Sequence, residues 1–374
     1  MYEEYNLKTN PFTDTKQDYP MLNRVVLDKN LKKILSSYIG SKNPAIVPIV
    51  GEYGVGKTFY LMKICEKINN ETFFEDKKKT VLSSYITATY PKPPSQYIHY
   101  VYSECMNNLG FEKFKKLILG LIKEGKDELL NKLDRNFKNA VLNFTENETI
   151  AWDYLRGETV DRSEAKEIGV KRSIQNDKQS LTALLNFLKL LCISGYASFV
   201  FLIDEFEYLF SKGSQRGAEF LNTFRFLYDR TLDNLSREKD IANPIFIAAC
   251  TPYIWDQILQ DAEKNILGTK PFVDRATEQI PIDPFTVGET KALIQIRLDK
   301  WRINKRNKEK LGLFPFIEDK KNNPFELIRK ISRGLPRIIL KNTATILEKA
   351  YDKRLKKISL KEAKSIVREL GLEV

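Results

Sequence analysis

The chain has 374 residues, of which 42% are hydrophobic, so it is long enough for two compact units with filled cores. No apolar run approaches the roughly 20 residues that a membrane span needs, and the polar N-terminal stretch is unlike a signal peptide, so we expect a cytoplasmic protein without a membrane partner. Four well-separated cysteines without a CxxC pair favour free thiols, and the single histidine, His99, excludes a His-based triad or a His-rich metal site.

The positive charge is concentrated at one end of the chain. The net charge is +12, and residues 291–374 hold 23 Lys and Arg against 10 Asp and Glu. The other 290 residues hold 38 basic against 39 acidic side chains. Such segregation indicates a polyanionic partner such as DNA, because basic side chains gain affinity by releasing the counterions of nucleic acid. The alternative to a polyanionic partner is that these basic side chains only form a solvated face of the helices.

The first part of the chain alternates strand and helix patterns. An apolar run at 45–50 ends at glycines, as buried parallel strands do, and 58–68 has the spacing of an amphipathic helix. A β-rich run at 80–89 stops at prolines, and a helix of about 95–108 follows. This alternation predicts a doubly wound α/β domain.

A long helical stretch interrupts this α/β pattern. The segment of about 109–180 exceeds what a connection between strands needs, so we interpret it as a helical insertion whose role the residues do not reveal. Strand patterns return at 198–203, 244–250 and about 278–282, with a helix pattern at 217–235. Only helix patterns follow, at 288–300, 324–332, 339–354 and 360–370. The sequence therefore predicts a helical C-terminal domain.

A phosphate-binding loop lies between the first strand and the first helix of the α/β pattern. It satisfies G-x-x-x-x-G-K-[ST] with the residues Gly51, Glu52, Tyr53, Gly54, Val55, Gly56, Lys57 and Thr58. The glycines allow backbone N–H groups to turn toward phosphates, and the helix N-terminus adds partial positive charge. We expect Lys57 to reach the β- and γ-phosphates of ATP and Thr58 to bind Mg²⁺.

Two later strands end in polar side chains. The run 199–203 delivers Asp204 and Glu205 to its tip, the edge of a parallel sheet where ligands bind. We expect Asp204 to hold the Mg²⁺ shell and Glu205 to orient and polarise the attacking water. Thr251 ends the next strand and is placed to touch the γ-phosphate or that water. The alternative for Thr251 is a helix cap before Pro252.

These motifs together resemble the AAA+ ATPases, in particular the origin-recognition initiators and transposition regulators. The resemblance rests on the phosphate loop, the acidic strand end, Thr251, a leading Asn10-Pro11-Phe12 and a late Gly334-Leu335-Pro336-Arg337. It implies that Arg337 is the second sensor, touching the γ-phosphate from the same subunit. It also implies a homo-oligomer in which an arginine acts on the neighbouring subunit. Arg275 stands where the family places that arginine, and Arg225 and Arg230 are rivals.

A narrower likeness runs from Trp152 to Arg230. The blocks AWDYLRGE at 151–158, Ile168-Gly169-Val170, Gly195-Tyr196 and Gln215-Arg216 look like the BrxD-type ATPases of phage-defence islands. This resemblance implies a helicase or another DNA-processing protein as partner.

The resemblance also sets the domain boundaries that we expect. Residues 1–39 form an N-terminal segment near the nucleotide base, 40–283 an α/β AAA+ domain with a parallel sheet and the helical insertion, and 284–374 a basic, all-α lid domain. Two basic clusters in the lid are candidates for DNA contact. They comprise Lys300, Arg302, Lys305, Arg306, Lys308 and Lys310 beside Trp301, and Lys349, Lys353, Arg354, Lys356 and Lys357.

The sequence therefore favours an ATP-driven, DNA-associated switch that recruits or loads a DNA-processing partner. Two alternatives remain at this level. One is a signalling or scaffolding ATPase in which nucleotide controls assembly, and the other is a motor that remodels proteins. The motor would need an aromatic pore loop, which we do not identify in the sequence.

Overall fold

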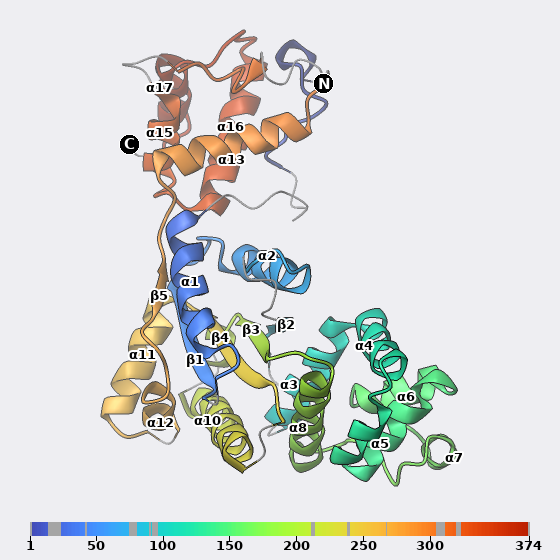
Figure 1. Cartoon of the computed structure of the whole chain (residues 1–374). Helices are drawn as coiled ribbons and strands as arrows, with labels where there is room; N and C mark the ends of the chain where they lie inside the picture. The colour runs from blue at the N-terminus through green and yellow to red at the C-terminus, as the bar shows by residue number, and fades with distance from the viewer. Residues whose placement is uncertain are drawn as a thin grey trace. The chain divides into compact units, whose positions relative to one another are not determined.

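The computed structural model describes residues 2–13, 24–41, 43–74, 81–89, 91, 96–210, 214–237, 240–266, 268–303, 311–318 and 323–372. Its strands are β1 (Ala45–Gly51), β2 (Val81–Thr87), β3 (Ser198–Asp204), β4 (Asn243–Cys250) and β5 (Ile280–Ile282). They form one five-stranded sheet in the order β2-β3-β4-β1-β5 (Figure 1). The pairs β1–β4, β3–β4 and β2–β3 are parallel, as the sequence predicts.

Helices lie before and between the strands of this sheet along the chain. They are α1 (Val25–Tyr38), α2 (Lys57–Asn69), α3 (Tyr97–Leu109), α8 (Asp177–Ile193), α9 (Glu207–Phe210), α10 (Ser214–Arg237), α11 (Pro252–Glu263) and α12 (Thr269–Val273). The strands β1, β3 and β4 are buried along their whole length, because helices cover a parallel sheet on both faces. The prediction of a doubly wound α/β core is confirmed.

The predicted insertion is a compact group of short helices, α4 (Phe111–Lys123), α5 (Arg135–Leu142), α6 (Glu148–Leu155) and α7 (Arg162–Glu167), with 3-10 turns at Asp127–Lys132 and Asn143–Thr145. Figure 1 shows these helices gathered beside α8. The stretch 146–176 is polar and shows no regular periodicity in the sequence, yet it contains two of these helices. The Asp161 side chain accepts a hydrogen bond from the Glu164 backbone N–H, and the Glu164 carboxylate accepts one from the Asp161 backbone N–H. This capping box stabilises the start of α7 in a polar segment.

The helices after residue 283 are α13 (Val287–Lys300), α15 (Pro324–Ile331), α16 (Pro336–Asp352) and α17 (Leu360–Glu369). Together with Tyr5, Leu7 and Phe12 they bury a second apolar core, separate from the core of the sheet and insertion. Asn10 donates to the carbonyl of Ala344 at 3.1 Å. The leading Asn-Pro-Phe motif is therefore anchored on α16.

The chain divides into two compact units. One comprises residues 1–25, 51–60 and 282–374, and thus contains the phosphate loop together with the C-terminal helices. The other comprises 26–50 and 61–281, with the sheet and the insertion. Within the described residues, no helix is both long and apolar enough to cross a bilayer.

Candidate nucleotide site

The phosphate loop has the backbone that its motif requires. It follows β1 and leads into α2, and Gly54 and Gly56 have φ of 84° and 98°. In this left-handed region a side chain would be strained, which explains both glycines. A Cβ on Gly51 would lie 3.0 Å from the carbonyl oxygen of Ile282, so close packing explains the first glycine. Each of the three glycines in the loop therefore has a structural reason, a positive φ at Gly54 and Gly56 and close packing at Gly51.

Lys57 is buried at the first position of α2. Its side chain is 7% exposed, and Nζ donates to the carbonyl oxygens of Gly51 at 2.8 Å and Glu52 at 3.4 Å. The ammonium is thus folded back over its own loop rather than extended into water. Thr58 follows at the N-terminus of the same helix, where the helix dipole favours anions.

Arg337 lies against the phosphate loop within the same compact unit. Its Nη1 donates to the hydroxyl of Tyr53 at 2.6 Å, and its guanidinium stands 5.5 Å from the centre of the Tyr53 ring. The Arg337 backbone N–H also points at the carbonyl of Gly54, at 3.5 Å. The sequence predicts both residues as site members, but it gives no sign that they contact each other.

A glycine turn positions Arg337. Gly334 has φ of 68°, and a Cβ there would lie 2.6 Å from the carbonyl oxygen of Phe285. Phe285 N–H donates to the Gly334 carbonyl at 2.7 Å. Pro336 then begins α16, where its missing N–H costs nothing, so Arg337 stands in the first turn of that helix.

Asp204 ends β3 and is 1% exposed. Its Oδ2 accepts a 2.8 Å hydrogen bond from the hydroxyl of Tyr85 on β2. Thr87 is the register partner of Asp204, and Tyr85 is two residues earlier on the same face of β2, so the tyrosine reaches Asp204 diagonally. Burial, and after it the Asp204 carboxylate, raises the pKa of Tyr85 above its ordinary value, so the hydroxyl remains a donor. Sequence reasoning missed Tyr85.

Glu205 is exposed and has φ of 54°, in the left-handed region. This conformation costs a non-glycine residue roughly 1–2 kcal/mol, and such strain concentrates at functional sites. The carbonyl of Glu205 accepts from Tyr208 N–H at 2.8 Å, and Phe206 N–H donates to Ala249. The backbone on both sides thus holds Glu205 out of the core, immediately after Asp204.

Thr251 immediately follows β4 and occupies the N-cap position of α11. Its side chain makes no capping hydrogen bond, so the hydroxyl is not used for the alternative role that the sequence leaves open. The registers pair Val50 with Cys250 and Ile203 with Ala248. In parallel strands this places the ends of β1, β3 and β4 along one edge of the sheet. The phosphate loop follows β1 directly in the chain.

Arg275 forms hydrogen bonds within its own compact unit. Its Nε and Nη2 donate to the two carboxylate oxygens of Asp229 at 2.8 and 3.1 Å, and Nη1 donates to the carbonyl of Pro271 at 2.7 Å. Its rival Arg225 lies 4.0 Å from Asp229, and Arg230 stacks 5.0 Å from the ring of Phe226. An action of Arg275 on a neighbouring subunit would require release from Asp229.

The prediction that the first basic cluster contacts DNA is wrong for Arg302. Arg302 is 0% exposed, and it donates to the carbonyls of Tyr5 at 3.0 Å, Gly312 at 2.9 Å and Phe314 at 2.6 Å. It therefore anchors the N-terminal segment and cannot grip a phosphate backbone. Lys305, Arg306, Lys308 and Lys310 lie outside the described residues.

The second basic cluster is at the surface. Lys353, Arg354, Lys356 and Lys357 are exposed in the turn after α16, while Lys349 is half-buried. Lys353 pairs with Glu369. Within the described residues no ion pair involves the other three exposed side chains.

The side-chain chemistry of Thr58 and Asp204, each considered within its own unit, suits Mg²⁺. The candidate Mg²⁺ ligands are a threonine hydroxyl and a buried carboxylate, which are hard oxygen donors of the kind that Mg²⁺ prefers. Gly56 adds an opening, because a Cβ there would meet nothing within 4 Å. The described residues contain no cluster of three or more His, Cys, Asp and Glu side chains suited to another metal.

Residues 130–306 match the family model described as BREX system ATP-binding protein BrxC/D. The ORC2 protein of Aeropyrum pernix in ADPNP–ADP complexes is similar in structure, with a TM-score of 0.50 and 16% identity over 97% of this chain and 72% of that chain. Its ADP form gives a TM-score of 0.50 and 12% identity over 97% and 73%. Drosophila ORC bound to DNA gives a TM-score of 0.42 and 13% identity over 96% of this chain and 64% of that chain. The comparison with curated proteins gives no match.

At these identities the similarity to ORC2 shows the fold, an α/β core of the AAA+ kind with a helical domain. The family match covers most of the insertion, from residue 130 onward, includes the acidic strand end, and runs through α13. Over residues 130–306 the chain is similar to the BrxC/BrxD family, and its fold is the one that it shares with ORC2. The resemblance predicted from the sequence is thereby confirmed.

Proposed function

We propose that this protein binds ATP with Mg²⁺ and hydrolyses it, and that the nucleotide cycle drives a DNA-associated switch. The phosphate loop carries the proposal. Its two left-handed glycines, its buried lysine and the helix that starts at Lys57 form a structure suited to a triphosphate.

Each site residue has a distinct proposed role. The backbone N–H groups of residues 51–58 surround the phosphates, and Lys57 exchanges the Gly51 carbonyl for the β- and γ-phosphate oxygens. Thr58 and Asp204 hold the metal, with Tyr85 fixing the Asp204 carboxylate. Mg²⁺, when bound, supplies positive charge against the phosphate oxygens.

Glu205 is proposed to accept a hydrogen bond from the attacking water and to orient it. Its strained backbone keeps its carboxylate beyond the end of β3, where it is exposed. Thr251 has a hydroxyl that does not cap α11, and this hydroxyl is proposed to position the water or the γ-phosphate. Arg337 is proposed to touch the γ-phosphate from the same subunit, and Arg275 to act on a neighbouring subunit in an oligomer.

The DNA-associated part of the proposal is supported by the charge of residues 291–374 and by the exposed basic turn at 353–357. The BREX description of the matching family supports a role in phage defence. A DNA-processing protein such as a helicase is the partner that we propose is recruited or loaded. A steep loss of DNA affinity with added salt should accompany this role.

The hydrolytic proposal is tested by comparing Glu205→Gln with Glu263→Gln, an exposed glutamate at the end of α11 that serves as the matched control. Glu205→Gln should bind ATP, lose turnover and accumulate as an assembly, whereas Glu263→Gln should behave as wild type. Tight nucleotide retention without turnover in the wild type would instead favour the scaffolding alternative. Failure of the wild type to bind ATP with Mg²⁺ would refute the proposal.

A further inference from the structure

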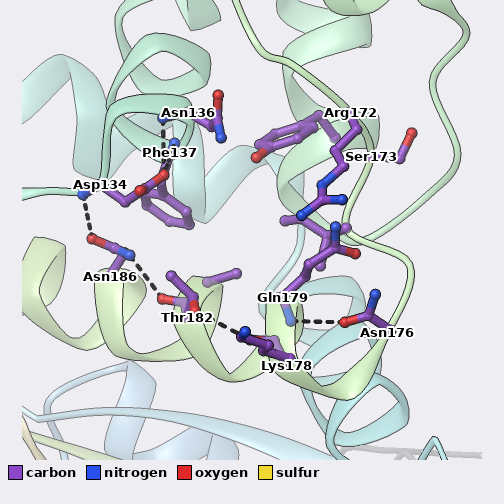
Figure 2. Close-up of a pocket in the computed structure, with 13 residues that line it drawn as sticks. Asp134, Asn136, Phe137, Arg172, Ser173, Asn176, Lys178, Gln179, Thr182 and Asn186 are labelled. Carbon is purple, nitrogen blue, oxygen red and sulfur yellow. Dashed lines mark hydrogen bonds between the residues drawn. The ribbon is translucent and has the colours of Figure 1, made fainter.

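The insertion contains a polar pocket that the nucleotide cycle does not use. It has a volume of about 250 Å³ and lies between the starts of α5 and α8, α6 and the loop before α8 (Figure 2). None of the residues proposed above for nucleotide binding lines it. The pocket has two basic residues, Arg172 and Lys178, and one acidic residue, Asp134, in its lining.

Most side-chain acceptors of this pocket already take part in hydrogen bonds, and among the described residues Oδ2 of Asp134 is an exception. Asp134 Oδ1 accepts from Asn136 N–H at 2.9 Å, and it thereby caps α5. The same pattern holds for four amide oxygens, each of which accepts from a backbone N–H at 2.7 to 3.3 Å. They belong to Asn136, Asn176, Gln179 and Asn186. A ligand therefore meets few free acceptors.

The donors, in contrast, remain available. Within the described residues, no hydrogen bond or ion pair involves the guanidinium of Arg172, the ammonium of Lys178 or the hydroxyl of Tyr154, which are all part of the lining. The NH₂ groups of Asn136, Asn176 and Gln179 are likewise unbonded among the described residues. Figure 2 shows Arg172 extending its guanidinium into the same space as the side chain of Gln179.

A surplus of donors selects a ligand rich in acceptors and negative charge. Arginine binds phosphate oxygens through two parallel N–H groups, and the N-terminus of the 17-residue helix α8 adds partial positive charge. Phe137 and Ile174 give the pocket an apolar wall, 2% and 3% exposed. The volume is just below the range of drug-sized sites, so it suits a small ligand with one anionic group.

We propose that this pocket binds a small organic phosphate, with the phosphate held by Arg172, Lys178 and the free amides and the ring against Phe137 and Ile174. Nucleoside monophosphates and sugar phosphates share this chemistry. The site shares no residue with the proposed ATP site, so this proposal does not depend on ATP binding.

The test is isothermal titration calorimetry on full-length Lys57→Ala protein, in which the phosphate loop no longer competes for the ligand. The probes are AMP, ribose 5-phosphate, inorganic phosphate and adenosine. Phosphate esters should bind at least about tenfold more tightly than adenosine. AMP binding above ribose 5-phosphate would assign the ring to the base, and equal affinities would assign it to the sugar. Absence of binding for all three phosphates, or adenosine equal to AMP, would overturn the proposal.

A pair of neighbouring variants places the ligand in this pocket. Arg172→Met should weaken binding about tenfold, because it removes a charge-assisted contact. Lys171→Met removes an equal charge from a residue that is exposed, as Arg172 is, but lies outside the lining, and it should change the affinity less than about twofold. Lys178→Met is the second lining variant, for use if Arg172→Met does not fold. Equal effects of the lining variant and Lys171→Met would overturn the proposal.

Discussion

Replacing Tyr53 by phenylalanine should strengthen ATP binding. In the structure the Tyr53 hydroxyl accepts a hydrogen bond from Arg337 at 2.6 Å. If Arg337 is the sensor of the γ-phosphate, ATP must take the guanidinium away from this hydroxyl. Tyr53→Phe removes the competing bond while it keeps the ring, whose contact with the guanidinium spans 5.5 Å.

The size of this effect follows from exposure. A hydrogen bond to a charged group contributes roughly 1.5–3 kcal/mol when it is shielded from water. Tyr53 is 68% exposed and Arg337 is also exposed, so solvent screening reduces the contribution to about 0.5–1 kcal/mol. Removal of the bond should therefore raise ATP affinity by about two- to fivefold.

Equilibrium binding of ATP and ADP, measured in parallel, provides the assay. ADP affinity should be unchanged, because ADP lacks the phosphate that Arg337 is proposed to touch. In an Arg337→Ala background, Tyr53→Phe should have no effect on ATP. Weaker ATP binding by Tyr53→Phe, or an equal gain in the Arg337→Ala background, would refute this reasoning.

Three further changes test other contacts. Asp229→Asn should weaken the two hydrogen bonds that hold Arg275. It should lower the free energy of unfolding by no more than about 1 kcal/mol, because the pair is partly exposed. If Arg275 acts in trans, the variant should also have higher ATPase activity at protein concentrations at which subunits assemble. Burial is the main cause that lowers the pKa of His99, so the unfolded chain binds a proton at a higher pH than the folded protein does. The free energy of unfolding should therefore decrease as pH falls below 6.5. His99→Gln should flatten this part of the pH profile. Arg302→Leu leaves three carbonyls without their donor and should cost about 3 kcal/mol or more in a urea titration.

Each of these three has a result that contradicts it. ATPase activity of Asp229→Asn that stays at the wild-type value at every protein concentration would argue against action of Arg275 in trans. An unaltered acid profile in His99→Gln would show that other groups set the pH dependence, since the chain has a single histidine. Wild-type stability of Arg302→Leu would mean that water replaces the buried guanidinium.

The α/β fold was predictable because its signals are local. Strands such as 45–50 are continuous apolar runs, and the phosphate loop fixes its own conformation through Gly54 and Gly56. The acidic pair follows its strand within two residues, so the position of Asp204 at the end of β3 needs no knowledge of distant contacts. Short helices such as α7 were missed, because their capping by Asp161 stabilises a segment too polar to show a periodic pattern.

Contacts across the chain could not be read from the sequence. Tyr85 reaches Asp204 through strand register, and Tyr53 meets Arg337 across 284 residues of sequence. Burial is equally non-local, because Arg302 lies in a basic run and yet has 0% exposure. A charge pattern gives the sign of a surface, but tertiary packing decides which of its residues reach that surface.

The central claim is that the phosphate loop and the end of β3 act on the same magnesium–triphosphate group. A double-mutant cycle of Thr58→Ala and Asp204→Asn, measured as the gain in ATP affinity on adding Mg²⁺, tests it most directly. Either change alone should abolish most of that gain, and the double variant should lose little more, with a coupling free energy of about 1 kcal/mol or above. Strictly additive losses would show that the two residues act on separate groups, and would contradict the account.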